Sequence, residues 1–571
     1  MAITTLLRHL ANIAAPGLLF LSPFLVFVRF HDYPIWRPEI LVVALALIGL
    51  GMPFGLLIAI RPKTFGAAAL TVLVLVCTTE VLVSRYPDSL TAWDSFLQSV
   101  VDWGGSLGLY AVLGLGAVVV VGGLIALFGL LGRNLGIVMS TVFGVAAAST
   151  VLLPTEATLT GEIFRKEVQA NSSLPLIIHL VLDEHMGIEG LPAEIDGSET
   201  LREDLMAFYR DYGFQVWARA FSQYTQTRNN LASIFNARPS ADERSPDGRE
   251  QRSSELRDNL WFRHLADQGY RIRIYYIEEI DFCGAENKAV SSCFVYRGNS
   301  VGALVDTEIP ALSAAKIVSG SFLNTFTLFN ILGRQWLKDR GWQDLLPKWL
   351  MTRSVVGVPP SLKILSQIRE DLKRGSGGTA IFAHLIIPHH TYNYDRECRI
   401  KADTDKWSHS VSFVDVDIQS AVINSPESRR QHYRGYFDQL GCLYRALREF
   451  LDDLEASGLL QDATIILHGD HGSRISLLTP NRDSAERLSD ADLVDNYSVL
   501  YAVRRPGSRP AYDLNLRSIQ SLFAEMFLER RYPDDGPVVV LDDWLQMQRA
   551  PPSDSRVRVP MPDFGGCGGA C

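Results

Sequence analysis

The chain has 571 residues, a formal net charge of −9 and a hydrophobic share of 47%. The negative charge argues against a nucleic-acid partner, which would require a basic surface. The high hydrophobic share is unusual for a soluble protein and is concentrated near the N-terminus, so we expect a membrane-embedded domain.

Five N-terminal stretches each approach or exceed the roughly 20 apolar residues that a helix needs to cross a bilayer. A cleaved signal peptide is the alternative for the first stretch, but four more follow it and no clear small-residue cleavage site does. We therefore predict a transmembrane domain over residues 1–155. The five spans are Leu10–Phe30, Ile40–Ile60, Phe65–Val83, Leu107–Leu131 and Leu135–Leu153.

Lysine and arginine in the short loops predict the orientation of the spans. With the N-terminus inside, the cytoplasmic ends carry Arg8, Arg61, Lys63 and Arg133. An odd number of spans then places everything after Leu153 outside the cytoplasm.

The cysteines give an independent indication of compartment. Of the seven, Cys77 lies inside a predicted span, and the other six form three local pairs, which fits an oxidising compartment better than six unrelated thiols. No CxxC pair occurs, so a structural zinc cluster is not expected. The predicted disulfides join Cys283 to Cys293, Cys398 to Cys442 and Cys567 to Cys571.

The rest of the chain has the pattern of an α/β domain. Residues 156–175 are polar and indicate a linker, and the Pro- and Gly-rich residues 548–571 indicate a loosely ordered tail. Between them, over 176–547, short apolar runs alternate with amphipathic stretches such as Tyr436–Leu454, which predicts a largely parallel sheet with helices on both faces. The predicted strands are Leu176–Leu182, Tyr270–Ile277, Ala380–Ile387, Thr464–Leu467 and Val499–Val503.

The segment Ala303–Trp349 interrupts this pattern with an apolar run and an amphipathic stretch. A sixth span here would separate His389 and Asp470 from Thr227 across the membrane. We therefore expect a helical insert that covers the domain or lies on the membrane surface, with an ordinary core-packing insert as the alternative.

Polar residues follow two of the predicted strands. Asp183 and Glu184 end the run Leu176–Leu182, where carboxylates are costly to bury unless something pairs with them. Metal ligation would satisfy them, and solvated loop acids are the alternative. Binding sites in such sheets gather at the carboxyl ends of strands, which is where this acidic pair stands.

The segment HGDHGSR ends another predicted strand. It places Asp470 between His468 and His471, with Arg474 three residues further on. A cluster this dense indicates metal ligands, and the arginine could neutralise an oxyanion or pair with the acids.

Two histidines accompany the run Ala380–Ile387. His389 follows Pro388 at the end of the strand, where it could contact a substrate oxygen or a leaving group. His384 lies within the strand and is either a satisfied core residue or a substrate contact.

Thr227 opens an amphipathic helical stretch. Its hydroxyl would feel the positive end of the helix dipole, and a metal would favour the nucleophilic alkoxide. The alternatives are that it only caps the helix, or that Thr225 is the nucleophile.

The segments LIIHLVLDEH, YTQTRNNLAS, IPHHTY and ILHGDHGSR occur in the order seen in the sulfatase-like branch of the alkaline phosphatase superfamily. Combined with five preceding spans, the chain resembles the phosphoethanolamine transferases and the lipoteichoic acid synthases. The resemblance implies an alkaline-phosphatase-like α/β fold and a bound divalent metal, Zn²⁺ in most cases, with Mn²⁺ or Mg²⁺ in some relatives.

The same resemblance implies roles for individual residues. Thr227 matches the nucleophile that takes the phospho group, and His389 matches a substrate-side histidine. No Cys/Ser-x-Pro-x-Arg signature of classical sulfatases is present, which weakens a sulfatase assignment. The implied metal ligands are Asp183, Glu184, Asp470 and His471, and possible substrate contacts are His384, His468 and Arg474.

The function implied is transfer of phosphoethanolamine or phosphoglycerol from a membrane phospholipid to an envelope glycan or lipid, by an enzyme of the bacterial inner membrane whose catalytic domain faces outward. Alternatives are a membrane-anchored phosphodiesterase or sulfatase, and a non-catalytic envelope protein. The sequence identifies neither the headgroup, the acceptor nor the oligomeric state.

Overall fold

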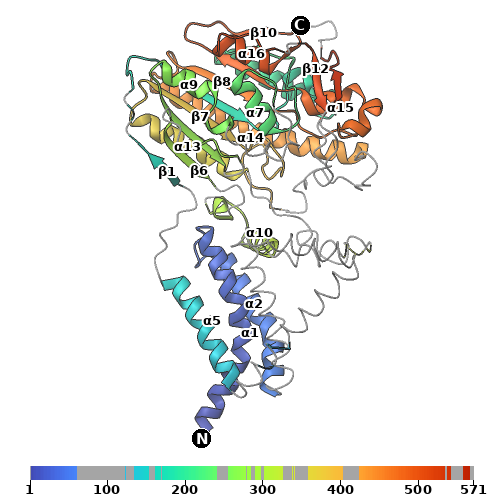
Figure 1. The fold of residues 1–571 in the computed structure, drawn as a ribbon. Coiled ribbons are helices and arrows are strands. Elements are labelled where there is room, and N and C mark those ends of the chain that lie inside the picture. The colour runs from blue at the N-terminus through green and yellow to red at the C-terminus, as the bar shows by residue number, and fades with distance from the viewer. Residues whose placement is uncertain are drawn as a thin grey trace, which may run out of the picture. The chain divides into compact units, whose positions relative to one another are not determined.

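The computed structural model describes residues 2–60, 134–152, 161–166, 171–240, 255–277, 280–283, 290–296, 301–325 except 306, 358–402, 424–533, 536–541 and 557–565, with isolated positions between them. The chain forms two compact units (Figure 1). The helical unit comprises Met1–Thr158 and Leu304–Ser354, and the sheet unit comprises Leu159–Ala303 and Val355–Cys571.

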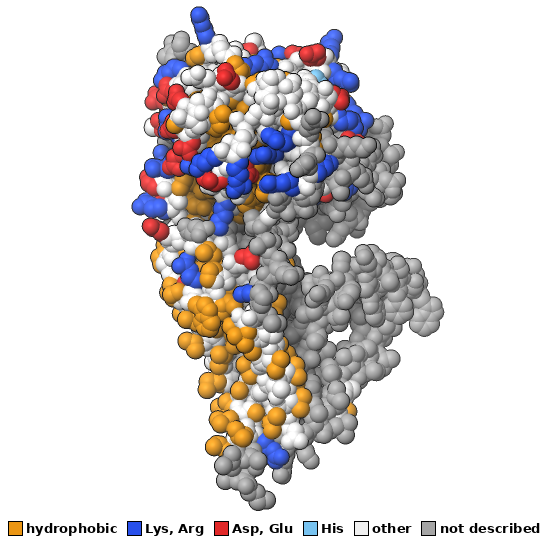
Figure 2. Space-filling view, turned by 90° about the vertical axis from the view of Figure 1, so that its left-hand side faces the viewer, with side chains coloured by type: hydrophobic (Ala, Val, Ile, Leu, Met, Phe, Trp, Pro, Cys, Tyr) orange, Lys and Arg blue, Asp and Glu red, His pale blue; other side chains and the backbone are white. Residues whose placement is uncertain are grey.

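The helical unit contains three apolar helices that pack together: α1 (Ala2–Phe30), α2 (Pro38–Ile60) and α5 (Leu135–Leu152). Within the described residues, Leu6–Phe30 and Pro38–Ile60 are long and apolar enough to cross a membrane, and Gly136–Leu152 is shorter. Figure 2 shows hydrophobic side chains covering these helices, as expected for lipid contact. The predicted spans Phe65–Val83 and Leu107–Leu131 lie outside the continuous described segments.

The described part of the insert after residue 303 packs on these helices. Helix α10 (Ala311–Asn324) lies against α2. The Phe322 ring meets those of Phe24 and Phe27, with centroid distances of 5.3 and 5.5 Å. Arg37 Nη2 donates to the Val305 carbonyl at 2.7 Å. The described part of the insert is therefore part of the helical unit.

The sheet unit is built on nine strands in the order β1-β6-β5-β7-β2-β8-β9-β3-β10. Its central strands β6, β5, β7, β2 and β8 run parallel to one another, which confirms the predicted α/β sheet. Every residue of β2 is buried, as expected for a strand with both faces covered. The strands are β1 (Gly161–Arg165), β2 (Ile177–Leu182), β3 (Gln215–Trp217), β5 (Arg271–Ile277), β6 (Val290–Tyr296), β7 (Thr379–Leu385), β8 (Thr464–Gly469), β9 (Tyr501–Arg504) and β10 (Ala511–Asp513).

Helices pack on this sheet and extend its core. Side chains of α7, α9 and α16 share one apolar cluster with the strands, while α13 packs on β5 and β7, and α14 packs on α13 and α6. Small paired strands β4 (Ala220–Phe221) with β11 (Arg517–Ser518), and β12 with β13, flank the sheet. The helices are α6 (Ser198–Asp211), α7 (Thr227–Asn236), α9 (Leu260–Asp267), α13 (Pro359–Lys373), α14 (Pro426–Ala456), α15 (Asp490–Tyr497) and α16 (Ile519–Phe527), and the 3₁₀ turns are η3 (Ile188–Gly190), η4 (Val301–Leu304) and η8 (Arg482–Arg487).

The strand expected at Val499–Val503 is present as β9, which runs antiparallel to β8. Two local predictions need correction. The expected linker contains β1, which pairs with β6, and the expected loose tail contains β13 (Val557–Pro560), which pairs with β12 (Val538–Leu541). These pairings join segments that are distant in sequence or individually short, so local composition does not reveal them.

Two of the three predicted disulfides are present. Cys283 bonds to Cys293 and Cys398 bonds to Cys442. Cys77, Cys567 and Cys571 lie outside the described residues.

A buried histidine pair joins β2 to β8. His179 Nε2 and His468 Nε2 are 2.8 Å apart, and His468 Nδ1 lies 2.7 Å from the Gly469 carbonyl. Since that carbonyl can only accept, His468 donates from Nδ1 and accepts at Nε2 from His179. Burial lowers the pKa of His468 to about 4 and that of His179 well below its ordinary value.

This pair should make stability depend on pH. The unfolded chain binds protons on both imidazoles near pH 6.5 and the folded chain does not. Stability is therefore complete above that pH and falls as the pH drops towards 4, by about 1.4 kcal/mol per pH unit for each histidine. Urea unfolding of the detergent-solubilised protein between pH 7.5 and 4.5 measures the slope. The double variant His179→Leu/His468→Leu should show a shallower slope, and a slope equal to that of the wild type would contradict this account.

Candidate active site

Three loops meet at one edge of the sheet because their strands are neighbours. They follow β7, β2 and β8, which lie side by side in that order and run in the same direction. Parallel strands end at the same edge, so the segments 386–393, 183–186 and 470–474 converge there. This convergence brings together most of the site residues predicted from the sequence.

Asp183, Glu184 and Asp470 form the acidic centre of the site. Their side chains are buried, with relative exposures of 4%, 0% and 0%. Among the described residues, Asp183 Oδ1, Glu184 Oε1 and Asp470 Oδ2 have no hydrogen-bond partner. Asp470 Oδ1 does accept, from the backbone amides of Glu184 at 3.0 Å and His471 at 2.9 Å. Carboxylate oxygens buried in this way require a nearby positive charge.

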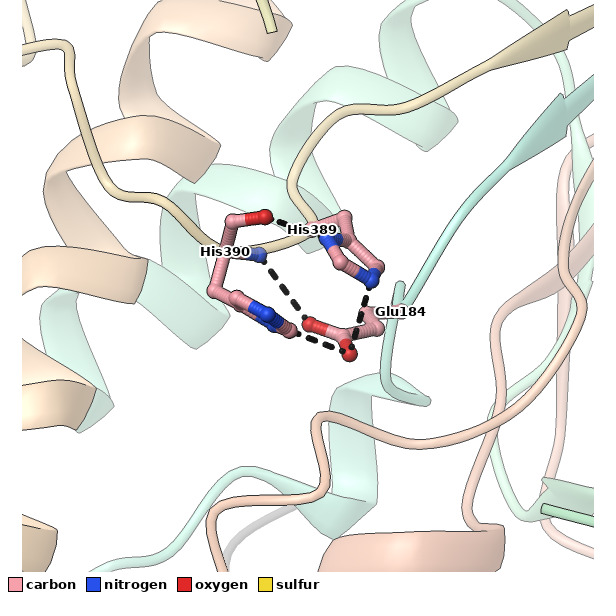
Figure 3. Close-up of side chains that lie close together, drawn as sticks. All are labelled: Glu184, His389 and His390. Carbon is pink, nitrogen blue, oxygen red and sulfur yellow. Dashed lines mark hydrogen bonds and ion pairs between the residues drawn. The ribbon is translucent and has the colours of Figure 1, made fainter. Parts of the chain in front are cut away.

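Two histidines bracket the Glu184 carboxylate (Figure 3). His389 Nε2 lies 3.4 Å and His390 Nδ1 3.5 Å from Glu184 Oε1. The His390 amide donates to Glu184 Oε2 at 3.2 Å. Arg474 Nε lies 3.1 Å from the same Oε1 atom, so positive or dipolar groups approach this carboxylate from two loops.

His471 connects the acids to the candidate nucleophile. Its Nε2 atom lies 3.2 Å from Asp470 Oδ2, 3.6 Å from Asp183 Oδ1 and 3.3 Å from Thr227 Oγ1. Arg474 Nη2 donates to the same nitrogen at 2.7 Å. The structure therefore places the Thr227 hydroxyl beside the acidic centre.

Helix α7 presents Thr227 at its first turn. Leu231, Ile234 and Phe235 anchor the helix in the sheet core. Gln226 precedes the helix in an extended conformation, and no side-chain capping bond is present at that end. Thr227 is partly exposed, so a substrate can reach the hydroxyl, whereas Thr225 is buried.

The two remaining candidate histidines differ in their surroundings. His384 Nε2 lies 3.4 Å from Asp183 Oδ2, so His384 belongs to the site. His468 does not, because its ring lies among the aromatic side chains of the core beside His179. The structure thus gives His468 a structural contact in place of the substrate contact suggested by the sequence.

The electrostatics keep the acids ionised. Burial alone would raise the pKa of the Glu184 carboxyl, but His389, Arg474 and His390 outweigh it and lower the pKa to about 2. Burial is likewise outweighed at Asp183, where His389 and His384 hold the pKa below its usual range. Burial would lower the pKa of His389, but Glu184 and Asp183 raise it, so His389 holds a proton more readily than a free imidazole.

Burial lowers the pKa of two other site histidines. The neighbouring His389 lowers the pKa of His390 further, and Arg474 lowers the pKa of His471 further. Both imidazoles are therefore neutral at pH 7, and the neutral form is the one that binds metal ions.

Two site residues hold unfavourable backbone conformations. Glu184 has φ of 64° and Arg474 has φ of 57°, in the left-handed region that glycine tolerates best. Strain of this kind persists where surrounding contacts fix the chain, and it is common at functional sites. Here it directs both side chains to the same acidic centre.

The donor set fits a divalent cation. Two groups of ligand atoms each lie within 4.8 Å of one another: Glu184 with His389 and His390, and Asp183 with His384 and Asp470. Carboxylate oxygens and imidazole nitrogens suit zinc, and mostly oxygen sets suit manganese or magnesium. The unpartnered carboxylate oxygens are the atoms that a cation would satisfy, so the residues fit the metal that the sequence predicts.

Sequence reasoning assigned no role to three residues that contact the site loops. His390 is adjacent to His389, and only the fold shows that it reaches Glu184. Tyr436 and Gln439 lie on α14, where they look like ordinary members of an amphipathic helix. No local signal in the sequence distinguishes these two residues from core side chains.

Comparisons with known proteins give structural likenesses only. No family model and no curated protein matches the chain. The C-terminal periplasmic domain of EcEptC from Escherichia coli, in complex with zinc, is 12% identical, with 63% of this chain and 86% of that chain covered and a TM-score of 0.36. The lipoteichoic acid synthase LtaP from Listeria monocytogenes is 13% identical, with 64% and 74% covered and a TM-score of 0.34. The putative sulfatase yidJ from Bacteroides fragilis is 11% identical, with 66% and 76% covered and a TM-score of 0.34.

These neighbours are of the kinds found in the sulfatase-like branch of the alkaline phosphatase superfamily, which the sequence motifs resemble. At such TM-scores the likenesses carry no argument about reaction or substrate. The chemistry of this chain is therefore argued from its own residues.

Zinc should stabilise the sheet unit through the acidic centre. Asp470→Asn keeps the side chain's shape and one acceptor oxygen but removes a charge, so we expect it to lose most of the zinc-dependent rise in melting temperature. For the wild type, zinc at a hundredfold excess over its Kd contributes about 2.7 kcal/mol. The measurement is thermal unfolding of the detergent-solubilised protein with zinc and after chelation.

The control for this experiment is Asp371→Asn, which changes a buried aspartate hydrogen-bonded to Tyr275 outside the three site loops. It should lower the melting temperature without changing the zinc-dependent rise. An equal rise in the Asp470 variant, or none in the wild type, would rule out metal binding at the acidic centre.

Proposed function

We propose that this chain is a metal-dependent transferase that moves a phospho headgroup, phosphoethanolamine or phosphoglycerol, from a membrane phospholipid to a cell-envelope glycan or lipid. The observation that carries the proposal is the position of Thr227. The hydroxyl of Thr227, a partly exposed residue at a helix N-terminus, lies 3.3 Å from His471 Nε2, beside three buried carboxylates that a cation would satisfy. This arrangement suits an activated nucleophile for attack on phosphorus.

In the first half-reaction, Thr227 Oγ forms a bond to phosphorus as the bond from phosphorus to the diacylglycerol oxygen breaks. The threonine proton goes to water, and the departing oxygen takes a proton from His389, whose raised pKa suits a general acid. A divalent cation, when bound, would lower the pKa of the hydroxyl and neutralise charge on the transferring oxygens. Zinc is the cation that we expect, held by Asp183, Glu184, Asp470 and His471.

In the second half-reaction, an acceptor hydroxyl attacks phosphorus as the bond from phosphorus to Thr227 Oγ breaks, and Thr227 Oγ takes back a proton from water. The headgroup then resides on the acceptor, and His389 recovers its proton. His384 and Arg474 are the side chains that we assign to substrate oxygens, since both flank the acids. Arg474 offers the guanidinium geometry that suits phosphate.

The helical unit supports a lipid donor. Two helices of sufficient length and hydropathy to cross a membrane precede the sheet unit, and a phospholipid substrate is available only at a membrane. The disulfides Cys283–Cys293 and Cys398–Cys442 support an oxidising compartment. We therefore propose a multi-pass protein of the bacterial inner membrane whose catalytic domain lies outside the cytoplasm.

Thr227→Ala should keep the fold and abolish turnover, because it removes only a hydroxyl at the helix terminus. We expect the release of diacylglycerol to fall by a factor on the order of 10³ or more. Peptide mass spectrometry of the wild type, incubated with zinc and mixed bacterial phospholipids, should find an adduct of phosphoethanolamine or phosphoglycerol mass on Thr227. The control is Thr225→Ala. An adduct on Thr225, or activity retained by the Thr227 variant, would show that the nucleophile is wrongly assigned.

The dependence of turnover on an acceptor separates a transferase from a hydrolase. A transferase should release diacylglycerol only stoichiometrically until an envelope glycan or lipid is added, because the phospho-threonine waits for a hydroxyl. Diacylglycerol release is measured over time with and without lipid A or a periplasmic glucan. Multiple turnovers without any acceptor, with free phosphorylated headgroup as product, would identify a membrane-anchored hydrolase.

A further inference from the structure

A single helix contacts all three loops that carry the candidate site. Helix α14 places Arg429, Tyr433, Tyr436 and Gln439 at spacings of four, three and three residues. At 3.6 residues per turn they fall within an arc of about 120°, and they extend over about 15 Å of helix. All four side chains are buried, with relative exposures of 7%, 0%, 0% and 0%.

Tyr436 joins α14 to the loop that carries the acidic pair. Its hydroxyl donates to the Glu184 carbonyl at 2.9 Å and accepts from the Met186 amide at 3.0 Å. Those two backbone groups flank the site where the chain takes its left-handed turn at Glu184, with φ of 64°. One phenol thereby satisfies a donor and an acceptor that the turn leaves without a strand partner.

Gln439 joins the same helix to the histidine loop. Its Nε2 donates to the carbonyls of Pro388 at 3.1 Å and His389 at 2.7 Å, and its Oε1 accepts from the Asn393 amide at 3.0 Å. The amide thus holds the loop before and after His390. Close by, Cys398 is bonded to Cys442 on the next turn of the helix, so a covalent link fixes the far end of the loop to α14.

Tyr433 and Arg429 join α14 to the third loop through Asp495. Arg429 donates to both carboxylate oxygens of Asp495, at 2.9 and 3.0 Å, and Tyr433 donates to the same carboxylate and contacts Ser473 Oγ at 3.0 Å. The Asp495 carbonyl in turn accepts from the Arg474 amide at 3.0 Å. This network fixes the backbone between His471 and Arg474.

We propose that α14 is the positioning element of this site. Tyr436 fixes the backbone of the ligand Glu184, Gln439 fixes the loop whose His389 and His390 contact the Glu184 carboxylate, and neither side chain touches substrate. This role rests on the proposed function only for the identity of the reaction. All three loops start from strands that fix their first residues but not their tips. Hydrogen bonds from one rigid helix fix the three loop tips relative to one another. Residues that hydrogen-bond to metal ligands generally orient those ligands in this way.

The alternative is that these side chains only stabilise the fold. A purely structural role would lower the melting temperature without changing metal affinity or geometry. A positioning role changes metal affinity by about 10- to 100-fold, as loss of such supporting groups typically does. The two roles therefore differ in a quantity that does not depend on turnover.

The test uses Tyr436→Phe and Gln439→Leu in the full-length, detergent-solubilised protein. Zinc affinity is measured by competition with a chromogenic chelator, and the visible absorption of the cobalt-loaded protein reports ligand geometry. We expect the zinc Kd to rise about tenfold or more and the cobalt bands to shift in both variants. Transfer activity should show a lower kcat with little change in KM.

The matched control is Tyr275→Phe, which removes a buried tyrosine hydroxyl that donates to Asp371 at 2.7 Å, away from the three loops. It should lose a similar amount of stability and keep the wild-type zinc affinity and cobalt spectrum. Gln439→Glu keeps an acceptor for the Asn393 amide but no donor for the two carbonyls, and it should fall short of wild-type affinity. Zinc affinity and cobalt spectra of Tyr436→Phe and Gln439→Leu that match the control would overturn the proposal.

The experiments distinguish a failure of the positioning role from a failure of the proposed transferase reaction. If the wild type forms no adduct on Thr227 but the two α14 variants change the cobalt spectrum, the positioning role stands and the transferase does not. If the adduct forms and the variants leave metal binding unchanged, the transferase stands and the positioning role fails.

Discussion

The structure depends on the burial of three carboxylates at one edge of a parallel sheet. Asp183, Glu184 and Asp470 are each at most 4% exposed, and each has an oxygen without a hydrogen-bond partner among the described residues. Like charges in a low-dielectric site repel each other and lose their hydration, so this arrangement is unfavourable by itself. Nearby histidines and Arg474 offset part of the cost, and a cation would offset more.

The same constraint explains why histidines of one unit behave differently. His179 and His468 lie among aromatic rings, and burial lowers their pKa values although the Gly469 carbonyl favours the charged form of His468. Burial would also lower the pKa of His389, but Glu184 and Asp183 outweigh it and the pKa rises. The balance between burial and neighbouring charge, and not residue type, sets which histidine can deliver a proton.

The sequence predicted the parts of the site that follow directly from strand ends. Asp183, Glu184 and Asp470 stand just beyond apolar runs that proved to be adjacent strands. The local sequence did not show that His468 is a core residue. Every residue of β8 after Thr464 is buried, so the strand has no alternation of apolar and polar residues that would assign His468 to one face.

Other features required knowledge of which distant segments meet. The two hydrogen bonds of Tyr436 and those of Gln439 depend on how α14 lies over loops that are 46 to 252 residues away in sequence. Strand β1 depends on β6, and β13 depends on β12. Hydrophobic periodicity identifies an element and its buried face, but it does not identify the partner of each polar side chain on that face.

The path of the chain between its two units bears on the proposed transferase. The chain passes between the two units three times, after Thr158, Ala303 and Ser354, because the insert with α10 returns to the helices. Three covalent connections therefore link the two units. Tethering a site to a membrane in general raises the effective concentration of a membrane-borne substrate. One anchor would suffice to retain a hydrolase of soluble esters at a membrane. The insert adds a further attachment to the helices, through the contacts of Phe322 with Phe24 and Phe27. Such an additional attachment is expected if the substrate itself is a lipid.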